Sequence, residues 1–556
     1  MITGNLKIIR GTLMNLYQAD LILFNGRVHT MDTVLPFATA VATRGDRILA
    51  VGTDSEVLSL RHQHTQILDL CGRAVFPGFI DAHIHFAWWA LCRQHVDLSD
   101  TSTPEQALTK VAAQAAQTPP GAWILGGGFD RNTWPGAAWP TRHMLDAVAP
   151  SHPVMLYTHD RHSIWVNTLA LHLASVTAGT PDPPGGCIVR DPATSEPIGI
   201  LSESAVELIR RVVPAPTSSQ VAAAIREAQP LAWAAGLTSI HEIHDTEDMM
   251  AFRAFQELHR LGKLGLRVCQ YVPASRLETF IQAGVQSGLG NEWVRIGGVK
   301  FFMDGALGSR TADMLEPYHG EPDNRGVPTI DKETMLEQAL QASRAGLSIS
   351  AHAIGDRANR NILDVLEVVR QDEKTNGRSH LRHRIEHVQV LHPDDLPRLA
   401  QLDVIASMQP IHATSDMLAA ERFWGPERCR WAYAWRSLLD AGTRLAFGSD
   451  APVEPFDVLA GIYAAVTRRR SNGTPGPEGW QPQERITALE AIQAYTLGAA
   501  YASGEETIKG TLTPGKLADI VVLSRDITAC PSAEILSTRV EITILGGQIV
   551  YQTSDF

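Results

Sequence analysis

Histidines, a lysine and an aspartate stand at matching places along the chain, each at or near the end of a short apolar run. His83 and His85 are two residues apart, so in an extended strand both imidazoles point to one side and can hold one ion. A single histidine of this kind is more often a core or surface residue than a ligand. Five separate runs that carry such groups at corresponding positions predict a metal site. The groups are His83, His85, Lys300, His352, His387 and Asp450.

Eight β-rich runs must position these groups. From the second run onward most gaps can hold a helix, for example residues 332–346 and 357–371. Helices that alternate with near-continuous apolar strands are typical of a parallel sheet, and eight repeats favour a closed (β/α)8 TIM barrel, an α/β fold with functional groups at the carboxyl ends of its strands. The expected strands are residues 79–85, 237–243, 266–272, 295–305, 347–353, 383–389, 404–410 and 445–451.

Both ends of the chain are rich in β-forming residues and glycine turns. Residues 19–32 contain two such runs joined by Asn25-Gly26, a strong hairpin signal, and residues 40–52 hold a second hairpin-like pair. Either end alone would expose strand edges, so we expect the two ends to build one small β-sandwich. The expected domains are a sandwich of residues 15–77 and 505–556, a barrel domain of residues 78–504, and an inserted subdomain within residues 100–230.

Two segments depart from the strand–helix alternation. Residues 86–236 are too long for one crossover and predict a subdomain inserted over the barrel mouth, with a Pro/Gly-rich middle at residues 180–199. Residues 468–483 are rich in Arg, Gly and Pro and follow the eighth strand. Loops at that position line the catalytic face of a barrel, so this one is expected to shape the pocket or act as a lid.

Composition limits the partners. The net charge of -12, from 48 basic against 60 acidic residues, argues against a nucleic acid or an anionic membrane and leaves a small-molecule substrate. The 6 cysteines include no CxxC pair and are typical of reduced thiols. No apolar run reaches bilayer-spanning length and no signal-peptide pattern opens the chain, so we expect a cytoplasmic protein. A homo-oligomer is compatible with such a barrel, although no surface patch indicates one.

Several motifs around these groups resemble the amidohydrolase superfamily. More narrowly, they are similar to its branch that contains N-substituted formamide deformylase and many metal-dependent hydrolases without an assigned substrate. The similarity covers nearly the whole chain and is specific for the branch but not for the substrate. The motifs are PGFIDAHIHF (77–86), VKFFMDGALGSRTA (299–312), SAHAIGDRA (350–358), RIEHVQ (384–389) and FGSDAPV (447–453), with HDRHSIWVNTLAL (159–171) and GTLTPGKLADIVVL (510–523) beyond them.

The resemblance implies a binuclear ligand set: His83, His85 and Asp450 on the more buried ion, and His352 and His387 on the second. Lys300 matches the strand-four lysine that reacts with CO₂ and bridges both ions as a carbamate. An ammonium beside two dications is disfavoured, which lowers the lysine pKa and makes the neutral amine carboxylatable. The alternative is an unmodified lysine beside a single ion. These ligands suit divalent zinc first, with iron, manganese, cobalt and nickel as alternatives.

The implied activity is that of an amidohydrolase, in which a metal-activated hydroxide cleaves a non-peptide C–N bond. The expected substrate is an amide, and a formamide is one candidate within that class. Asp450 is expected to accept the water proton and pass it to the departing nitrogen, against the alternative that it is a ligand only. The same site would also serve a cyclic amide, carbamate, ester or amino-heterocycle. A non-catalytic metal-binding regulatory protein is the alternative of another class, and the intact ligand set argues against it.

Substrate contacts are a further expectation, and each has a structural alternative. The tryptophans could instead fill a subdomain interface, Arg310 could form a salt bridge beside Asp304, and the histidines could be local structural residues. His241 and His244 on the second strand are interpreted as structural or as neighbours of metal ligands. The substrate-binding candidates are Trp88, Trp89, His162, Arg310 and His412.

Overall fold

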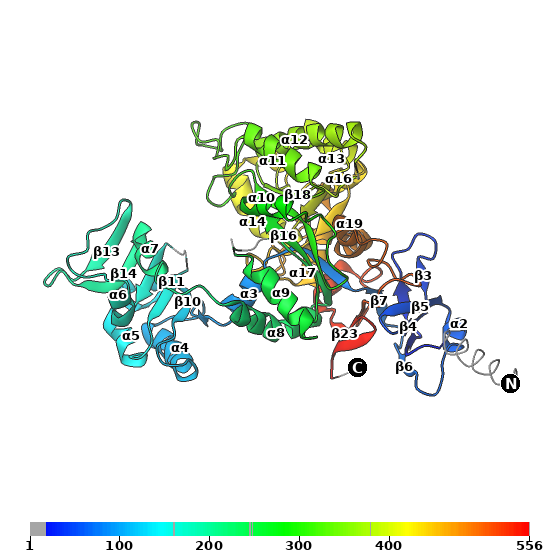
Figure 1. Ribbon diagram of the computed structural model, residues 1–556, viewed down its shortest axis with the longest axis horizontal. Helices are drawn as coiled ribbons and strands as arrows, with labels where there is room; N and C mark the ends of the chain where they lie inside the picture. The colour runs from blue at the N-terminus through cyan, green and yellow to red at the C-terminus, as the bar shows by residue number, and fades with distance from the viewer. Residues whose placement is uncertain (1–17, 160–161, 244–245, 247, 379, 555) are drawn as a thin grey trace. The chain divides into compact units, whose positions relative to one another are not determined.

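The computed structural model describes residues 18–159, 162–243, 246, 248–378, 380–554 and 556 (Figure 1). These residues form two compact units, one made of the chain up to Phe86 together with Ile225–Phe556, the other of Ala87–Ala224. His244 lies outside the described residues, and so does the start of the segment expected to open the sandwich. No helix in the described part of the chain is long and apolar enough to cross a membrane.

Eight parallel strands form the central sheet of the first unit, each paired with the next along the chain. The first and last strands meet where the Asp450 N–H donates to the His83 carbonyl at 2.6 Å and the His85 N–H donates to that of Ala451 at 2.9 Å. The expected (β/α)8 barrel is therefore confirmed. Its strands are β8 (Phe79–Ile84), β15 (Leu237–Glu242), β16 (Arg267–Pro273), β17 (Val294–Phe302), β18 (Ser348–Ala353), β19 (Arg384–His387), β20 (Ile405–Met408) and β21 (Leu445–Phe447).

Helices connect these strands because their apolar residues recur at helical spacing. In α12, for example, Ile362, Leu366 and Val369 are all buried on one face. Asp331 caps α11 by accepting from the N–H of Thr334, which fixes where that helix begins. The helices are α8 (Ser218–Ala234), α9 (Met250–Arg260), α10 (Leu277–Gln282), α11 (Lys332–Arg344), α12 (Asp356–Thr375), α13 (Leu396–Gln401), α14 (Pro410–Phe423), α15 (Pro426–Cys429), α16 (Trp435–Asp440), α17 (Val458–Thr467), α18 (Ala488–Gln493) and α19 (Ala499–Ala502).

Strands from both ends of the chain share one sheet, as the blue and red strands of Figure 1 show. In it β7 pairs with β2 on one side and with β22 on the other, and the sheet packs on a second, four-stranded one through a common core that includes Leu23, Val75 and Ile542. The shared sheet has the order β24 (Gln548–Gln552), β23 (Val540–Leu545), β22 (Ile520–Leu523), β7 (Ala74–Pro77), β2 (Arg27–His29) and β3 (Phe37–Ala38); the other has β5 (Arg47–Gly52), β4 (Ala40–Arg44), β1 (Leu21–Phe24) and β6 (Gln66–Asp69).

The two hairpin signals at the amino end have different outcomes. Strands β4 and β5 pair antiparallel, as expected for residues 40–52. The hairpin predicted at Asn25-Gly26 is wrong, because β1 and β2 lie in different sheets. Asn25 has a left-handed backbone (φ 57), and a Cβ on Gly26 would lie 2.5 Å from Leu70 Cδ1. The dipeptide therefore makes a tight crossover between sheets, since a turn sequence specifies the local backbone and not the strand's partner.

The second unit is a mixed six-stranded sheet with helices on it. Apolar clusters around Leu156 and Ile164 form its core. The Pro/Gly-rich residues 180–199 contribute two of its strands, β13 and β14. The sheet order is β13 (Gly186–Arg190), β14 (Pro197–Glu203), β12 (Ser163–Val166), β11 (Val154–Thr158), β10 (Ile124–Phe129) and β9 (Val96–Asp97), with α3 (Phe86–Cys92), α4 (Pro104–Gln117), α5 (Arg142–Val148), α6 (Thr168–Leu173) and α7 (Glu207–Arg210).

The loop at residues 468–483 follows helix α17 rather than the eighth strand itself. Its first residue, Arg468, is fully buried and donates to the carbonyl oxygens of Tyr433 and Trp480, each at 2.9 Å. The start of the loop is thus fixed to the barrel, while a lid role for the remainder stays a prediction.

A buried ion pair joins the barrel to the sandwich and yields a stability prediction. Arg267 on β16 donates to both carboxylate oxygens of Asp519, at 2.7 and 3.0 Å. Asp519→Ala leaves a buried arginine without its counter-charge, so the free energy of unfolding should fall by about 3–5 kcal/mol, measured by urea denaturation. The control is Asp440→Ala, which breaks an exposed pair with Arg436 and should cost less than about 1 kcal/mol. Equal losses in the two variants would contradict the structural role of this pair.

Candidate metal centre

The structure brings all six predicted ligands to the carboxyl-end face of the barrel, where they line one cavity of about 350 Å³. Lys300, His352 and His387 lie within the last three residues of β17, β18 and β19. His83 and His85 lie near the end of β8 and just after it, and Asp450 follows β21 by three residues. Parallel strands end at one edge, which is why groups far apart in the sequence meet here. The ligand candidates in the cavity wall are His83, His85, Lys300, His352, His387 and Asp450.

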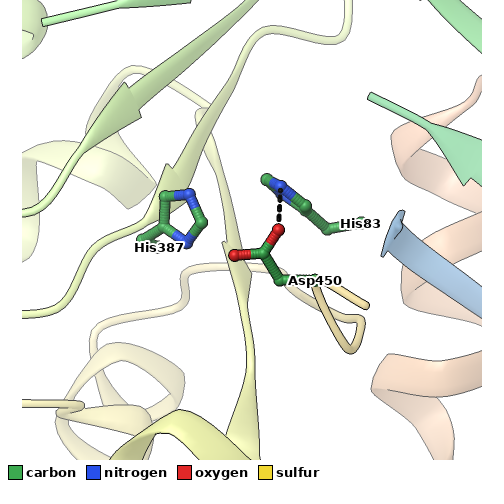
Figure 2. Close-up of side chains that lie close together, drawn as sticks. All are labelled: His83, His387 and Asp450. Atoms are coloured by element: carbon green, nitrogen blue, oxygen red, sulfur yellow. Dashed lines mark ion pairs between the residues drawn. The ribbon is translucent and has the colours of Figure 1, made fainter. Parts of the chain in front are cut away.

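Asp450 is the meeting point of the cluster. Its Oδ1 lies 3.3 Å from Nε2 of His83 and 3.0 Å from Nε2 of His85. Ligand atoms of His83, His387 and Asp450 all lie within 4.8 Å of one another, and Figure 2 shows the carboxylate between the two imidazoles. This group takes one histidine from each of the two expected ligand sets, so ions bound by the two sets would be close neighbours.

Two of the ligands have strained backbones. His387 has φ 75 and Asp450 has φ 61, in the left-handed region that non-glycine residues rarely adopt. Such a conformation costs on the order of 1–3 kcal/mol and persists only where the surroundings impose it. Here the barrel closure imposes it on Asp450, whose N–H is bound to the carbonyl of His83. With this left-handed backbone, both side chains line the cavity.

Lys300 has the environment that a carboxylated lysine needs. It is 2% exposed, and among the described residues its Nζ has no hydrogen-bond partner. Burial lowers the pKa of its amine to about 8, so the neutral amine that reacts with CO₂ is about half of the population at pH 8 and a smaller part at pH 7. Carboxylation would keep Nζ as an N–H group and add two carboxylate oxygens, which could bind a cation in the cavity. The residues therefore fit a bridging group.

The histidines on β18 and β19 each have one nitrogen fixed by the protein. Nε2 of His352 donates to the Gly305 carbonyl at 2.9 Å, and Nδ1 of His387 donates to Oε1 of Gln409 at 2.9 Å. The opposite nitrogen of each ring is then the one available to an ion. Burial lowers the pKa of His352 to about 3 and that of His387 well below its ordinary value, so both rings are neutral, as metal binding requires.

Sequence reasoning missed Glu386, which holds His83. Nδ1 of His83 donates to the Glu386 carboxylate at 2.6 Å, and both residues are buried. Burial alone would raise the pKa of Glu386, but the charges of Arg384 and His83 hold it well below its usual range. The sequence does contain a signal for this pairing. Arg384 and Glu386 are charged residues two apart in a fully buried strand, β19, so both side chains point to the same side and need partners there.

Asp304 organises the loops of the cavity and also approaches one candidate ligand, with its Oδ1 3.6 Å from Nε2 of His352. Its carboxylate accepts the backbone N–H groups of Ile354, Gly355 and Asp313 at 3.0, 2.8 and 2.9 Å. Burial nevertheless raises the pKa of Asp304 to about 7. Arg310, on the same loop, forms an ion pair with Glu321.

Of the substrate-binding candidates in the first unit, the structure brings only His412 into the cavity. Its Nε2 lies 3.8 Å from Oδ2 of Asp450, and its ring stacks on that of His387 at 6.1 Å. Arg310 is absent from the described residues that line the cavity, and its guanidinium lies over the ring of Phe423. His241 lies inside the barrel, where its Nδ1 accepts from Arg384 at 3.0 Å.

The remaining candidates belong to the second unit. His162 is exposed, with Nδ1 3.2 Å from the Glu203 carboxylate. Trp88 is half-exposed on α3, and the ring of Trp89 lies 5.2 Å from the guanidinium of Arg93. Contact of these three residues with substrate stays a prediction.

A closed (β/α)8 barrel with clustered histidines, lysine and aspartate at its carboxyl end defines a metal-dependent hydrolase. The model of the amidohydrolase family matches residues 66–551, and the chain belongs to that family.

Relatives and a solved structure extend this likeness over nearly the whole chain. Protein LONG AFTER FAR-RED 3 of Arabidopsis thaliana is 35% identical over 96% of this chain and 92% of its own length. N-substituted formamide deformylase of Arthrobacter pascens is 29% identical over 96% of this chain and 98% of its own length. The crystal structure of an uncharacterized metal-dependent hydrolase from Pyrococcus furiosus superposes with a TM-score of 0.76 and 30% identity over 91% of this chain and 99% of that one.

The contact between Glu386 and His83 yields a prediction about metal affinity. Glu386→Gln keeps the shape but weakens the acceptor that orients His83, so metal affinity should fall by roughly 10–100-fold, measured by competition with a chelator. Glu373→Gln is the matched control, because Glu373 accepts from Nε2 of buried His383 at 2.9 Å outside the cavity. The control should bind metal as the wild type does, and an equal loss in both variants would assign Glu386 a purely structural role.

Proposed function

We propose that this hydrolase cleaves a non-peptide C–N bond, in an amide and first of all a formamide, at a binuclear zinc centre. The observation that carries the proposal is the buried Nζ of Lys300, which has no hydrogen-bond partner among the described residues. It lies in the wall of a cavity that five other candidate ligand groups share. The likeness to N-substituted formamide deformylase along the chain supports the choice of bond. The proposal includes a small-molecule partner and a cytoplasmic location, and the net charge of -12 argues against nucleic acid or an anionic membrane as partner.

The ligand set of the proposal follows the strands. His83, His85 and Asp450 would hold one ion, His352 and His387 would hold the other, and Lys300 would join the two groups as a carbamate. The Asp450 contacts to both β8 histidines support the first group. The rings of His352 and His387, which meet edge to face with centroids 4.5 Å apart, support the second. A divalent ion bound here supplies one piece of chemistry, which is to lower the pKa of water from about 15.7 towards about 7.

The chain's own residues then move the proton and place the substrate. Asp450 accepts the proton of the attacking water and returns it to the departing nitrogen, so the leaving group is a neutral amine. His412 faces the second oxygen of Asp450, and its Nε2 has no hydrogen-bond partner among the described residues. It is therefore free to donate to the substrate carbonyl. Buried side chains around the cluster exclude bulk water from this exchange.

The test of the proposal is turnover of a panel of compounds together with metal content. Zinc-loaded protein should hydrolyse a set of N-substituted formamides and larger amides, with about two ions per chain. Preferential turnover of a cyclic amide, carbamate, ester or amino-heterocycle would show that the site cleaves a different class of substrate from the one proposed. Full metal load without turnover on any of them would indicate a non-catalytic metal-binding protein.

Asp450→Asn tests the proton transfer. The amide remains a possible ligand but cannot accept the water proton, so turnover should fall at least ~100-fold while the fold is retained. Metal content and circular dichroism are measured on the same sample. A near-normal rate with metal bound would remove Asp450 from the proton transfer.

Lys300→Ala tests the bridge. Without the carbamate the variant should hold fewer than two ions per chain and be nearly inactive, and added acetate or propionate should restore part of both by filling the vacated bridge. Lys509→Ala is the control, because this lysine is also buried but pairs with Glu505 away from the cavity; its metal content should equal that of the wild type. An intact mass that shows unmodified Lys300 in fully metal-loaded protein would refute the carbamate.

A further inference from the structure

The cavity carries two carboxylates that the proposed reaction does not use. Asp416 on α14 and Glu454 after β21 both line it, beyond the ligand cluster. Neither forms an ion pair with any basic residue in the part of the chain that the structure describes. Most carboxylates near a metal site are either ligands or neutralised by arginine or lysine, so these two are candidates to bind a ligand's charge.

Asp416 is held rigidly in place. Its Oδ2 accepts from the hydroxyl of buried Tyr433 at 2.6 Å. The backbone N–H of the same tyrosine donates to the carbonyl of Gln389 at 2.8 Å, which fixes a second residue of the cavity wall. One buried residue thus positions two polar groups of the wall before any ligand arrives. Such preorganisation lowers the cost of binding.

Unpartnered polar atoms beside the carboxylates point independently to a ligand. Gln389 lines the cavity and is only 3% exposed, yet among the described residues its Oε1 has no hydrogen-bond partner. His412, also in the wall, has an unpartnered Nε2. Buried polar atoms without partners are costly, so partners are expected from the substrate. The oxygen of Gln389 and both carboxylates accept hydrogen bonds, which calls for a ligand that donates them.

Nearby arginines do not neutralise Glu454. Arg469 and Arg470 line an adjoining cavity that shares Glu454 with the first. The Arg470 guanidinium, however, donates to the carbonyl oxygens of Thr414 and Ser415 at 2.9 and 3.0 Å, and that of Arg469 donates to Gly473 at 3.2 Å. Neither arginine forms an ion pair with Glu454 among the described residues, so its carboxylate oxygens stay available to a cation in the cavity.

The placement of the two acids suits a cation at one end of an elongated substrate. Asp416 follows His412 by four residues on α14, so it lies on the same helix face about 6 Å farther along the axis. A cation close to the metal ions would be repelled, whereas one turn away it meets the carboxylates. The same cavity has apolar lining residues: Phe302 and Val453 are 42% and 62% exposed and can pack against a methylene chain.

We infer that the substrate carries an ammonium group at the end of an apolar chain, and that Asp416 and Glu454 bind this ammonium while the amide lies at the metal centre. The inference rests on the proposed function only for the amide end. It names the substrate class as N-substituted amides of aliphatic diamines, with the uncleaved amino group protonated. The released product is then a diamine.

Two isosteric substrates test the inference: N-hexylformamide and the analogue whose terminal methyl is an ammonium. Zinc-loaded wild type should show a kcat/KM at least ~10-fold higher for the ammonium compound, as expected for a hydrogen bond between charged groups. In the double variant Asp416→Asn, Glu454→Gln this ratio should fall at least ~10-fold. Asn at residue 416 can still accept from Tyr433, so the wall is preserved. The matched control is Glu427→Gln, which changes an acid that is 82% exposed on α15 and should leave the ratio as in wild type.

The outcomes separate the two proposals. Turnover of both formamides at equal kcat/KM, or a ratio unchanged in the double variant, would overturn the ammonium site and leave the proposed function standing. If neither compound is hydrolysed, the proposed function fails, and calorimetric binding of both compounds to the zinc-loaded protein decides the inference. Tighter binding of the ammonium compound, lost in the double variant, would support the ammonium site, and equal binding would overturn it.

Discussion

A charge buried in the middle of a barrel needs an opposite charge in direct contact with it. The ion pair formed by Arg384 and Glu386 meets this requirement. Because a guanidinium has several donors in fixed directions, one side chain also ties neighbouring strands together. Glu386 in turn accepts from Ser350 of β18 and orients His83 of β8. The groups bound to Arg384 come from β8, β15, β16, β19 and β20: the Ala82 carbonyl, His241, Tyr271, Glu386 and Ser407.

Polar pairing at the centre therefore determines where two of the candidate metal ligands lie. His83 is fixed through Nδ1 and so presents Nε2 to Asp450, and His387 is fixed in the same way by Gln409. Lys300 differs, because its Nζ has no hydrogen-bond partner in the described protein and lies only over the ring of Phe302, 4.9 Å from its centroid. Groups that must be rigid have hydrogen-bond partners in the protein, and the group proposed to react with a small molecule has none among the described residues.

The barrel strands and the ligand positions could be predicted from the sequence because both depend on local pattern. Apolar runs define the strands, and parallel strands carry their terminal polar residues to one edge whatever lies between them. The pairing of Glu386 with His83 could not be found this way, since 303 residues separate them and only the closed barrel brings them together. Arg310 and Asn25-Gly26 show the same limit, because local sequence did not specify their partners. The left-handed backbone of Asp450 likewise follows from closure.

The shared sheet of the sandwich has a consequence for folding during synthesis on the ribosome. Strand β7 lies between β2 and β22, so one of its edges stays unpaired until residues 520–523 have been synthesised. Throughout translation of the barrel this buried, apolar strand exposes hydrogen-bonding groups that could recruit other nascent chains. We expect the barrel to fold first. The sheet that contains β7 would be completed only after β22 has left the ribosome, and chaperones would cover the unpaired strand until then.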